Sequence, residues 1–368
     1  MRKIKGFFLL AVICLTVIIV IGCGGGGSRT SDPGGSTTPL PGSLDPGLVG
    51  FATLNGGTTG GQGGPTVTVS TGTELQNAIK QGGPRIIYVN GTITPANSSD
   101  SKINVKDVNN ISIIGVGANG EFDGIGIKIT RANNIIIRNL KIHHVLTGDK
   151  DCISIEGPAS NIWVDHCELF NEYQGVNKDY YDALLDAKGD SAFITYSWNY
   201  LHDSWKASLN GSSEKDTYDR RVTYHHNAFI NINSRLPLYR GGQGHIYNNF
   251  YKDIFTSAVN SRLDAQLRVE NNVFINVKNP ICSLDSDTIG YWDARGNIFT
   301  NCTYSPGVIG PPVSTCTYDP PYMYTLDPVE DVELIVTQGA GVNKIDFSNP
   351  GEPSTTPGAT PGTTPTGP

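Results

Sequence analysis

The chain has 368 residues and a formal charge of −7, with 27 lysines and arginines against 34 aspartates and glutamates. A chain with this charge balance repels other polyanions, so we expect neither a nucleic acid nor an anionic membrane face as its partner. If the protein binds an anion, a local group of basic side chains must outweigh the overall charge.

Residues 1–22 are predicted to be an export signal. Arg2, Lys3 and Lys5 precede an apolar run that ends just before Cys23. The run is short for a membrane-spanning helix, and the position of the cysteine resembles a bacterial lipoprotein signal. Cleavage would leave Cys23 as the lipid-bearing N-terminus, so we expect an exported, extracellular or cell-surface protein anchored to a membrane. A plain secretory signal or an uncleaved anchor is the alternative.

Two segments rich in Gly, Ser, Thr and Pro flank the middle of the chain, at residues 23–65 and 348–368. Both contain few residues that can form a core, so we predict a flexible tether before the domain and a linker or tail after it. The remaining residues, 66–347, are predicted to form one large domain, which we expect to be a monomer.

The first element of this domain is predicted to be a short helix over residues 71–83. Thr73 is the expected N-cap residue. A helix here would close the open N-terminal end of the β-structure that follows it.

The rest of the domain repeats a short β-rich pattern. Runs such as NNIIIRNLKI, SNIWVDHCELF and RVTYHHNAFI recur at nearly regular intervals and end in asparagine or glycine. Such repeats indicate a solenoid, because one coil cannot bury its own apolar face and stacked coils share a core. Asparagine suits the turns, since it tolerates left-handed backbone and can bond its equivalent one coil away. We predict an all-β, right-handed parallel β-helix; sparse leucine disfavours leucine-rich repeats, and a β-sandwich needs no regular repeat.

Five cysteines remain once Cys14 and Cys23 are assigned to the export signal. Two disulfides could form among them in an oxidising compartment, but no pairing follows from the sequence. No spacing typical of a zinc site is present. We favour buried, structural cysteines at these positions: Cys152, Cys167, Cys282, Cys302 and Cys316.

Acidic residues interrupt the repeat at Asp165, Asp182 and Asp186. In a strand, Asp182 and Asp186 would be roughly 13 Å apart, too far to share one ion, whereas in a helical turn they would share a face. Carboxylates from adjacent coils would suit Ca²⁺, which takes oxygen ligands in irregular geometry. From spacing alone, solvated loop acids are the simpler interpretation, and the same holds for Lys206.

Two arginines, Arg235 and Arg240, lie close together around Pro237. Proline lacks an amide donor and favours extended backbone at Leu236, so this segment is expected to leave the regular ladder. The two arginines would then converge on one groove. The alternative is a pair of arginines at strand ends that bond loop carbonyls.

Five motifs occur in a fixed order: NIWVDHCEL, YYDALLDAKGDSAFITYSWNYL, HDSWKASLNG, RVTYHHNAFINI and SRLPLYRGGQGHIYNN. Together they closely resemble the pectate lyase family of parallel β-helix polysaccharide lyases (family 1), over roughly residues 66–300. The resemblance implies calcium ligands at Asp165, Asp182 and Asp186, a catalytic base at Arg235, and substrate contacts from Lys206 and Arg240. One departure is Trp163, where some members carry a further acidic ligand, and this puts the calcium affinity in question.

The activity implied is calcium-dependent cleavage of de-esterified α-1,4-polygalacturonate by β-elimination, which gives 4,5-unsaturated oligogalacturonates. Calcium would neutralise the uronate carboxylate and stabilise the enolate-like species formed when the C5 proton leaves. Two alternatives stay open: a pectin lyase acting on methyl-esterified pectin, and a non-catalytic cell-surface β-helix that binds glycans.

Overall fold

The computed structural model describes residues 47–310, 316 and 318–345. The predicted signal at 1–22, the lipidation site Cys23 and the tail at 348–368 lie outside these residues. Within the described part of the chain, no helix has the length and apolar character needed to span a bilayer.

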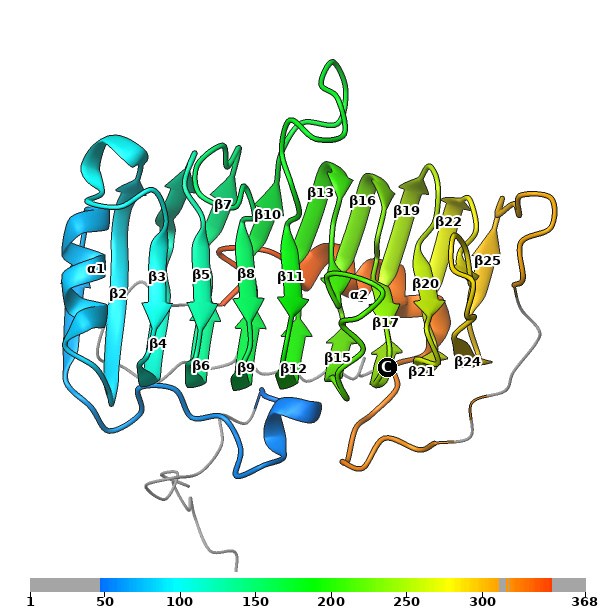
Figure 1. The fold of residues 1–368 in the computed structure, drawn as a ribbon, viewed down its shortest axis with the longest axis horizontal. Coiled ribbons are helices and arrows are strands. Elements are labelled where there is room, and N and C mark those ends of the chain that lie inside the picture. Colours follow the sequence, from blue (N-terminus) through cyan, green and yellow to red (C-terminus); the bar gives the residue numbers. More distant parts are fainter. Residues whose placement is uncertain (1–46, 311–315, 317, 346–368) are drawn as a thin grey trace, which may run out of the picture. The chain divides into compact units, whose positions relative to one another are not determined.

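Two parallel sheets wind around a common core (Figure 1). The smaller sheet has 8 strands, one from each successive coil. They are β3 (Ile103–Lys106), β5 (Ile127–Thr130), β8 (Ile153–Glu156), β11 (Leu185–Lys188), β14 (Leu209–Asn210), β17 (Leu238–Arg240), β20 (Val259–Arg262) and β23 (Ile281–Cys282). Each pairs in parallel with its neighbours one coil away. This arrangement confirms the predicted parallel β-helix.

The larger sheet has 17 strands, which pair in two columns. The first column contains β1 (Thr66–Val69), β2 (Arg85–Ile93), β4 (Asn109–Asp123), β6 (Asn133–Arg138), β9 (Ala159–Asp165), β12 (Ser191–Ser197), β15 (Arg221–His225), β18 (Gln243–Tyr247), β21 (Gln266–Glu270) and β24 (Tyr291–Arg295). The second contains β7 (Lys141–His143), β10 (Glu168–Phe170), β13 (Tyr200–Lys206), β16 (Ala228–Ser234), β19 (Phe250–Ile254), β22 (Val273–Val277) and β25 (Ile298–Thr300). The long strand β4 pairs with β6 in the first column and with β7 in the second.

The core consists of apolar columns that run from coil to coil. One column in the first set of strands is in register from Ile113 through Ile137 and Val164 to Tyr196 and Tyr224. All five side chains are buried. Stacking identical inward positions in this way removes apolar surface from water that no single coil could bury, which is why the repeat in the sequence is so regular.

An asparagine ladder holds the turn between the two columns, as the sequence analysis predicted. Each side-chain amide donates to the next asparagine Oδ1 at 3.0 Å, from Asn199 through Asn227, Asn249 and Asn272 to Asn297. The left-handed backbone is found one residue earlier, as at His226, where φ is 55°. The ladder asparagines therefore supply hydrogen bonds, while their predecessors make the turn.

A helix forms near the start of the domain, as predicted. α1 (Gly72–Lys80) buries Leu75, Ala78 and Ile79 in the main core cluster. Its N-cap is Thr71 and not the predicted Thr73: the Thr71 hydroxyl accepts the amide of Glu74, and the Glu74 carboxylate accepts the amide of Thr71. This reciprocal pair satisfies two amides that a helix start leaves free.

The predicted tether is too long, because residues 47–65 pack on the larger sheet. Phe51 and Ala52 lie in the short 3-10 helix Phe51–Thr53 and are fully buried. Their amides donate to the hydroxyls of Thr223 and Thr195, on β15 and β12. The few apolar residues of this segment are thus core residues, and its glycines permit close approach to the strands. We call residues 47–65 the N-terminal strap.

A second strap, residues 318–345, returns over the same sheet. It contains the 3-10 helix Val329–Asp331 and α2 (Val332–Gly339), which the sequence analysis did not predict. Val332 and Val336 pack against the second column. The two straps meet where the ring of Tyr322 lies 5.2 Å from that of Phe51. A further 3-10 helix, Pro95–Asn97, lies near α1.

The five cysteines of the domain are all free thiols. Cys152, Cys167, Cys282 and Cys316 are buried, and Cys302 is half-buried. This agrees with the preferred interpretation of structural cysteines.

Candidate functional site

Two of the predicted calcium-binding aspartates come together with a third that the sequence analysis missed. Asp186 lies on β11, and Asp182 lies in the irregular segment just before it. Asp151 lies on the preceding coil, before β8. The amide of Ala183 donates to the Asp151 carboxylate at 3.0 Å, and the amide of Asp182 donates to the carbonyl of Lys150. Residues 182–184 are neither helix nor strand, and the chain bends at Leu184, so Asp182 and Asp186 are joined by neither a helical turn nor a straight strand.

Two lysines lie between these carboxylates. Lys188 Nζ is 2.8 Å from Asp151 and 3.1 Å from Asp186. Lys206 Nζ is 2.9 Å from Asp182. We call these five residues the charged cluster. It brings opposite charges together beside β11, with Lys206 contributed by the end of β13 in the larger sheet, and so offers ligands to a cation and donors to an anion.

The carboxylates of the charged cluster are crowded. Burial raises the pKa of Asp186 to about 7; Lys188 opposes the shift, and the neighbouring Asp151 adds to it. Burial also raises the pKa of Asp151, against the pull of Lys188. A carboxylate that is buried without enough positive charge is costly to ionise, and such strained groups gather at functional sites.

Asp165 does not belong to this cluster, which corrects the prediction. It ends β9, in the larger sheet, and is fully buried. Its carboxylate accepts from Arg138 at 2.7 Å, Ser197 at 2.6 Å and His166 at 2.6 Å. Burial would raise its pKa, but His166 and Arg138 outweigh burial and lower the pKa well below its usual range. Asp165 is therefore a structural carboxylate with its acceptors already used.

Trp163 lies beside Asp165 in the same buried network. Its indole donates to Ser197 at 2.8 Å, and the Arg138 guanidinium lies 4.4 Å from its ring centre. It also packs under Leu48 and Ala52 of the N-terminal strap. The identity of residue 163 therefore carries no information about the calcium ligands.

The two arginines flank a bend between the sheets, as predicted. Arg235 follows β16, with a left-handed φ of 68°, and Arg240 ends β17. Burial lowers the pKa of Arg240; Glu214 opposes the shift, and the cationic Arg235 adds to it. Arg235 also acts electrostatically on Asp186. The two guanidinium groups thus converge near the charged cluster.

Their side chains differ in what holds them. Arg240 Nη1 donates to the Gly211 carbonyl at 2.7 Å, and its Nε lies 3.8 Å from Glu214. Among the described residues, the Arg235 side chain has no hydrogen-bond or ion-pair partner. Arg240 is partly anchored by the protein, whereas Arg235 is available to an external group.

Asp151 had a signal in the sequence. In DKDCISIEG and in YYDALLDAKG an aspartate comes just before a strand of the smaller sheet, in two successive coils. Because parallel coils stack in register, equivalent loop positions become spatial neighbours. The motif around Asp165 was more conspicuous, but it belongs to the other sheet.

The cluster fits a hard divalent cation. Asp151, Asp182 and Asp186 supply the oxygen ligands that Ca²⁺ prefers, and burial raises the pKa of Asp186, so a bound cation would stabilise its ionised form. The ligand oxygens of these three carboxylates do not all lie within 4.8 Å of one another. Such an open set leaves coordination positions for water and for the oxygens of a bound anion.

The family model described as pectate lyase matches residues 43–344. The chain belongs to the pectate lyase family, and it is a polysaccharide lyase.

Named relatives agree with this assignment. The chain is 57% identical over 315 residues to a pectate trisaccharide-lyase from Bacillus licheniformis, covering 85% of this chain and 90% of the relative. A pectate lyase from a Bacillus species in complex with trigalacturonate has a TM-score of 0.76 and 41% identity, covering 81% of this chain and 99% of that one. Pectate lyase C from Erwinia chrysanthemi with Ca²⁺ has a TM-score of 0.71 and 28% identity, covering 82% and 97%.

Proposed function

We propose that the protein is a calcium-dependent pectate lyase that cleaves de-esterified polygalacturonate by β-elimination. The observation that carries this proposal is the convergence of Asp151, Asp182 and Asp186 with Lys206 and Arg235 on one side of the β-helix. The substrate class is supported by the names of the relatives, one a pectate trisaccharide-lyase and one bound to trigalacturonate.

The acidic trio of Asp151, Asp182 and Asp186 is the proposed calcium site. Calcium bound there would neutralise the uronate carboxylate and so acidify the C5 proton. Lys206 is now paired with Asp182 at 2.9 Å. When a uronate carboxylate enters, Lys206 can exchange this partner for the substrate, since an ammonium group has several donors and a flexible stem.

Arg235 is the proposed base, and Arg240 the proposed substrate clamp. In its neutral form Arg235 takes the C5 proton and becomes a guanidinium. The C5–H electron pair forms the C4–C5 double bond, and the C4–O bond breaks with its electrons on the leaving oxygen, which takes a proton from water. The free side chain of Arg235 supports this role. Arg240, whose guanidinium is positioned by Gly211 and Glu214, offers further donors to a substrate carboxylate.

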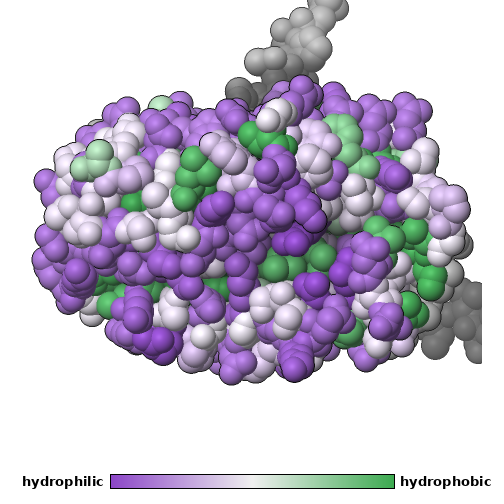
Figure 2. Space-filling view, turned by 45° about the horizontal axis from the view of Figure 1, so that its top comes forward, coloured by the Kyte–Doolittle hydropathy of each residue, from purple (hydrophilic) through white to green (hydrophobic). Residues whose placement is uncertain are grey.

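The surface around the site suits a polar ligand. Figure 2 shows a face that is mostly hydrophilic, with small and separate hydrophobic patches. A polyuronate bound in an extended conformation presents one charge per sugar, and such a ligand needs basic side chains and a cation more than an apolar surface.

The cellular location is also part of the proposal. The basic and apolar start of this chain is typical of an export signal. We propose that the protein is exported and held at the cell surface through a lipid on Cys23. Mass spectrometry of the mature N-terminus would test this: a free serine or glycine N-terminus downstream of Cys23 would contradict it.

The enzyme test uses polygalacturonate with chelator and with added calcium. We expect product with a conjugated double bond, followed in the ultraviolet, to appear with calcium and to vanish with chelator. Full activity in chelator would contradict calcium dependence. Absence of product under both conditions, with a folded protein, would contradict lyase activity on this substrate.

A further inference from the structure

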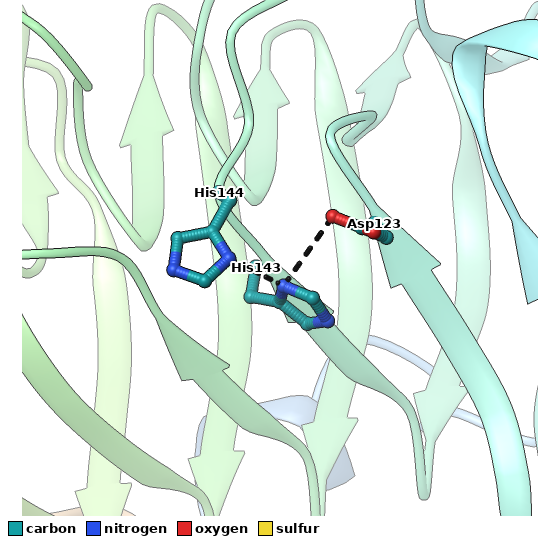
Figure 3. A group of neighbouring side chains, drawn as sticks. All are labelled: Asp123, His143 and His144. Carbon is teal, nitrogen blue, oxygen red and sulfur yellow. Dashed lines mark hydrogen bonds and ion pairs between the residues drawn. The ribbon is translucent and has the colours of Figure 1, made fainter.

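A second group of ligand-type side chains lies where β4 and β7 end. Asp123 is the last residue of β4, His143 is the last residue of β7, and His144 follows it. One ligand atom from each lies within 4.8 Å of the other two (Figure 3). The Nδ1 atoms of the two histidines are 2.8 Å apart, and His143 Nδ1 is 3.6 Å from Asp123 Oδ1.

The backbone explains why these side chains meet. Asp123 and His143 are register partners on adjacent coils, so their side chains start side by side. Successive residues of a strand normally point to opposite faces, which would separate the two histidines. His144 has a left-handed φ of 52°, and this breaks the alternation and brings its ring to that of His143.

A carboxylate behind His143 fixes the state of its ring. Glu121 Oε1 is 3.1 Å from His143 Nε2. A carboxylate oxygen accepts, so this contact makes Nε2 of His143 the donor, and Nδ1 presents its lone pair toward Asp123 and His144. Metal-binding histidines are commonly oriented by a carboxylate in this way.

We propose that Asp123, His143 and His144 form a binding site for a divalent transition metal ion of the zinc class. Two imidazole nitrogens and one carboxylate oxygen are a ligand set that Zn²⁺ accepts, with the fourth position left to water. Ca²⁺ takes oxygen ligands and does not compete for the two nitrogens. The Asp123 carboxylate, with 55% of its side chain exposed, gives an ion access from solvent.

Ring stacking restrains one of the two imidazoles. The ring of His143 is stacked on that of Phe170, with 4.7 Å between the ring centres, which holds His143 in place.

A second histidine pair in the same fold lacks these properties. His225 and His226 also have their Nδ1 atoms close together, at 2.9 Å, with a left-handed φ of 55° at His226. Here the nearby carboxylate, Asp327, bonds the far nitrogen of His226 at 2.8 Å. Among the described residues, this pair has no carboxylate that completes a compact group with it. The left-handed turn brings two histidines together in both places. Among the described residues, His143 and His144 have a third ligand, Asp123, and His225 and His226 do not.

The test is a zinc titration by isothermal calorimetry on the full chain without a histidine tag, in excess CaCl₂ so that calcium occupies any oxygen site. We expect one Zn²⁺ per chain. Asp123→Asn should weaken zinc binding at least tenfold, as is typical when a metal site loses an anchoring group. His144→Gln should remove stoichiometric binding. Cobalt in place of zinc should give a visible absorption band that both variants lose.

The matched controls are His202→Gln and Asp100→Asn. His202 is in register with Phe170 and His143 through β10, and its Nδ1 contacts one acid, Asp203, at 2.6 Å. Both controls should bind zinc as the wild type does. No zinc binding by the wild type, wild-type affinity in Asp123→Asn and His144→Gln, or loss of binding in His202→Gln would each overturn the proposal. Far-ultraviolet circular dichroism establishes that each variant is folded.

Discussion

Asp165 and Asp186 are both fully buried aspartates, yet their surroundings are opposite. Asp165, on the larger sheet, accepts three hydrogen bonds, and His166 and Arg138 lower its pKa against the effect of burial. Burial raises the pKa of Asp186, on the smaller sheet, and Asp151 adds to the shift, although Lys188 opposes it. A buried acid whose charge is well compensated supports the fold, whereas one whose ionised form its surroundings destabilise is suited to bind a cation.

The same contrast separates the two sheets. The larger sheet is covered by both straps, with Phe51 of one strap touching Tyr322 of the other. The charged cluster lies beside β11 of the smaller sheet, with Lys206 from the end of β13 and Arg235 next to it. We therefore expect substitutions beneath the straps to lower stability, and substitutions in the charged cluster to lower activity while the fold persists.

The largest effect is expected for Arg235→Lys. An ammonium keeps the positive charge but changes the reach and geometry needed at the C5 proton, so turnover should fall by about 100-fold or more. Calorimetric binding of oligogalacturonate in calcium should stay near that of the wild type. Arg240→Lys is the matched variant, and it should weaken binding and lower turnover only in part. A sizeable remaining rate in Arg235→Lys would refute the base assignment.

In the N-terminal strap, which covers the larger sheet, Phe51→Ala should destabilise the fold by about 3–5 kcal/mol, the usual cost of deleting a buried aromatic ring. A chain that begins at residue 66 should be similarly unstable, because it lacks the whole N-terminal strap. A chain that begins at residue 47 should unfold as the full domain does. Urea unfolding of the three proteins measures this, and equal stability for chains starting at 47 and at 66 would show that the strap contributes nothing.

The raised pKa of Asp186 gives a smaller, pH-dependent effect in chelator. An aspartate in an unfolded chain has a pKa of about 3.9, whereas the pKa of Asp186 in the folded protein is raised to about 7. Because the folded state holds the proton more tightly, the contribution of this group is greatest below the unfolded pKa and is lost as pH rises through the folded pKa. The asparagine of Asp186→Asn does not titrate, so the variant does not lose this stability as the pH rises. Between pH 4 and pH 8, thermal unfolding should show the free energy of unfolding of the variant rising relative to that of the wild type, by on the order of 1–3 kcal/mol. A constant difference across this range would contradict the crowding of the cluster.

The repeat, the asparagine ladder and the parallel β-helix could be predicted from the sequence because each coil obeys the same local rules. Positions such as Ile113 and Ile137 recur with the coil, and stacking follows from burying them. The N-terminal strap could not be recognised by composition, since its glycine-rich sequence hides a few residues, such as Phe51, that fit a surface made by distant strands.

The site was predicted in part. Asp182, Asp186, Lys206 and the two arginines occur in motifs that the fold brings to one place. The family resemblance implied that Asp165 belongs with them, but Asp165 lies in the other sheet and closes a buried network with Arg138 and Ser197. Which sheet a loop residue faces depends on where each coil turns, and the spacing between motifs does not encode that.

The most direct test of the account compares Asp151→Asn with Asp165→Asn in a calcium titration of polygalacturonate cleavage. The account predicts that Asp151→Asn raises the calcium concentration for half-maximal rate by about tenfold or more, since a hard-cation site loses a charged ligand, and leaves the melting temperature nearly unchanged. Asp165→Asn should keep the wild-type calcium requirement and lose about 2–4 kcal/mol of stability, because it removes the negative charge that Arg138 and His166 contact in the buried network. The reverse pattern, with a normal calcium requirement in Asp151→Asn and a raised one in Asp165→Asn, would contradict the account.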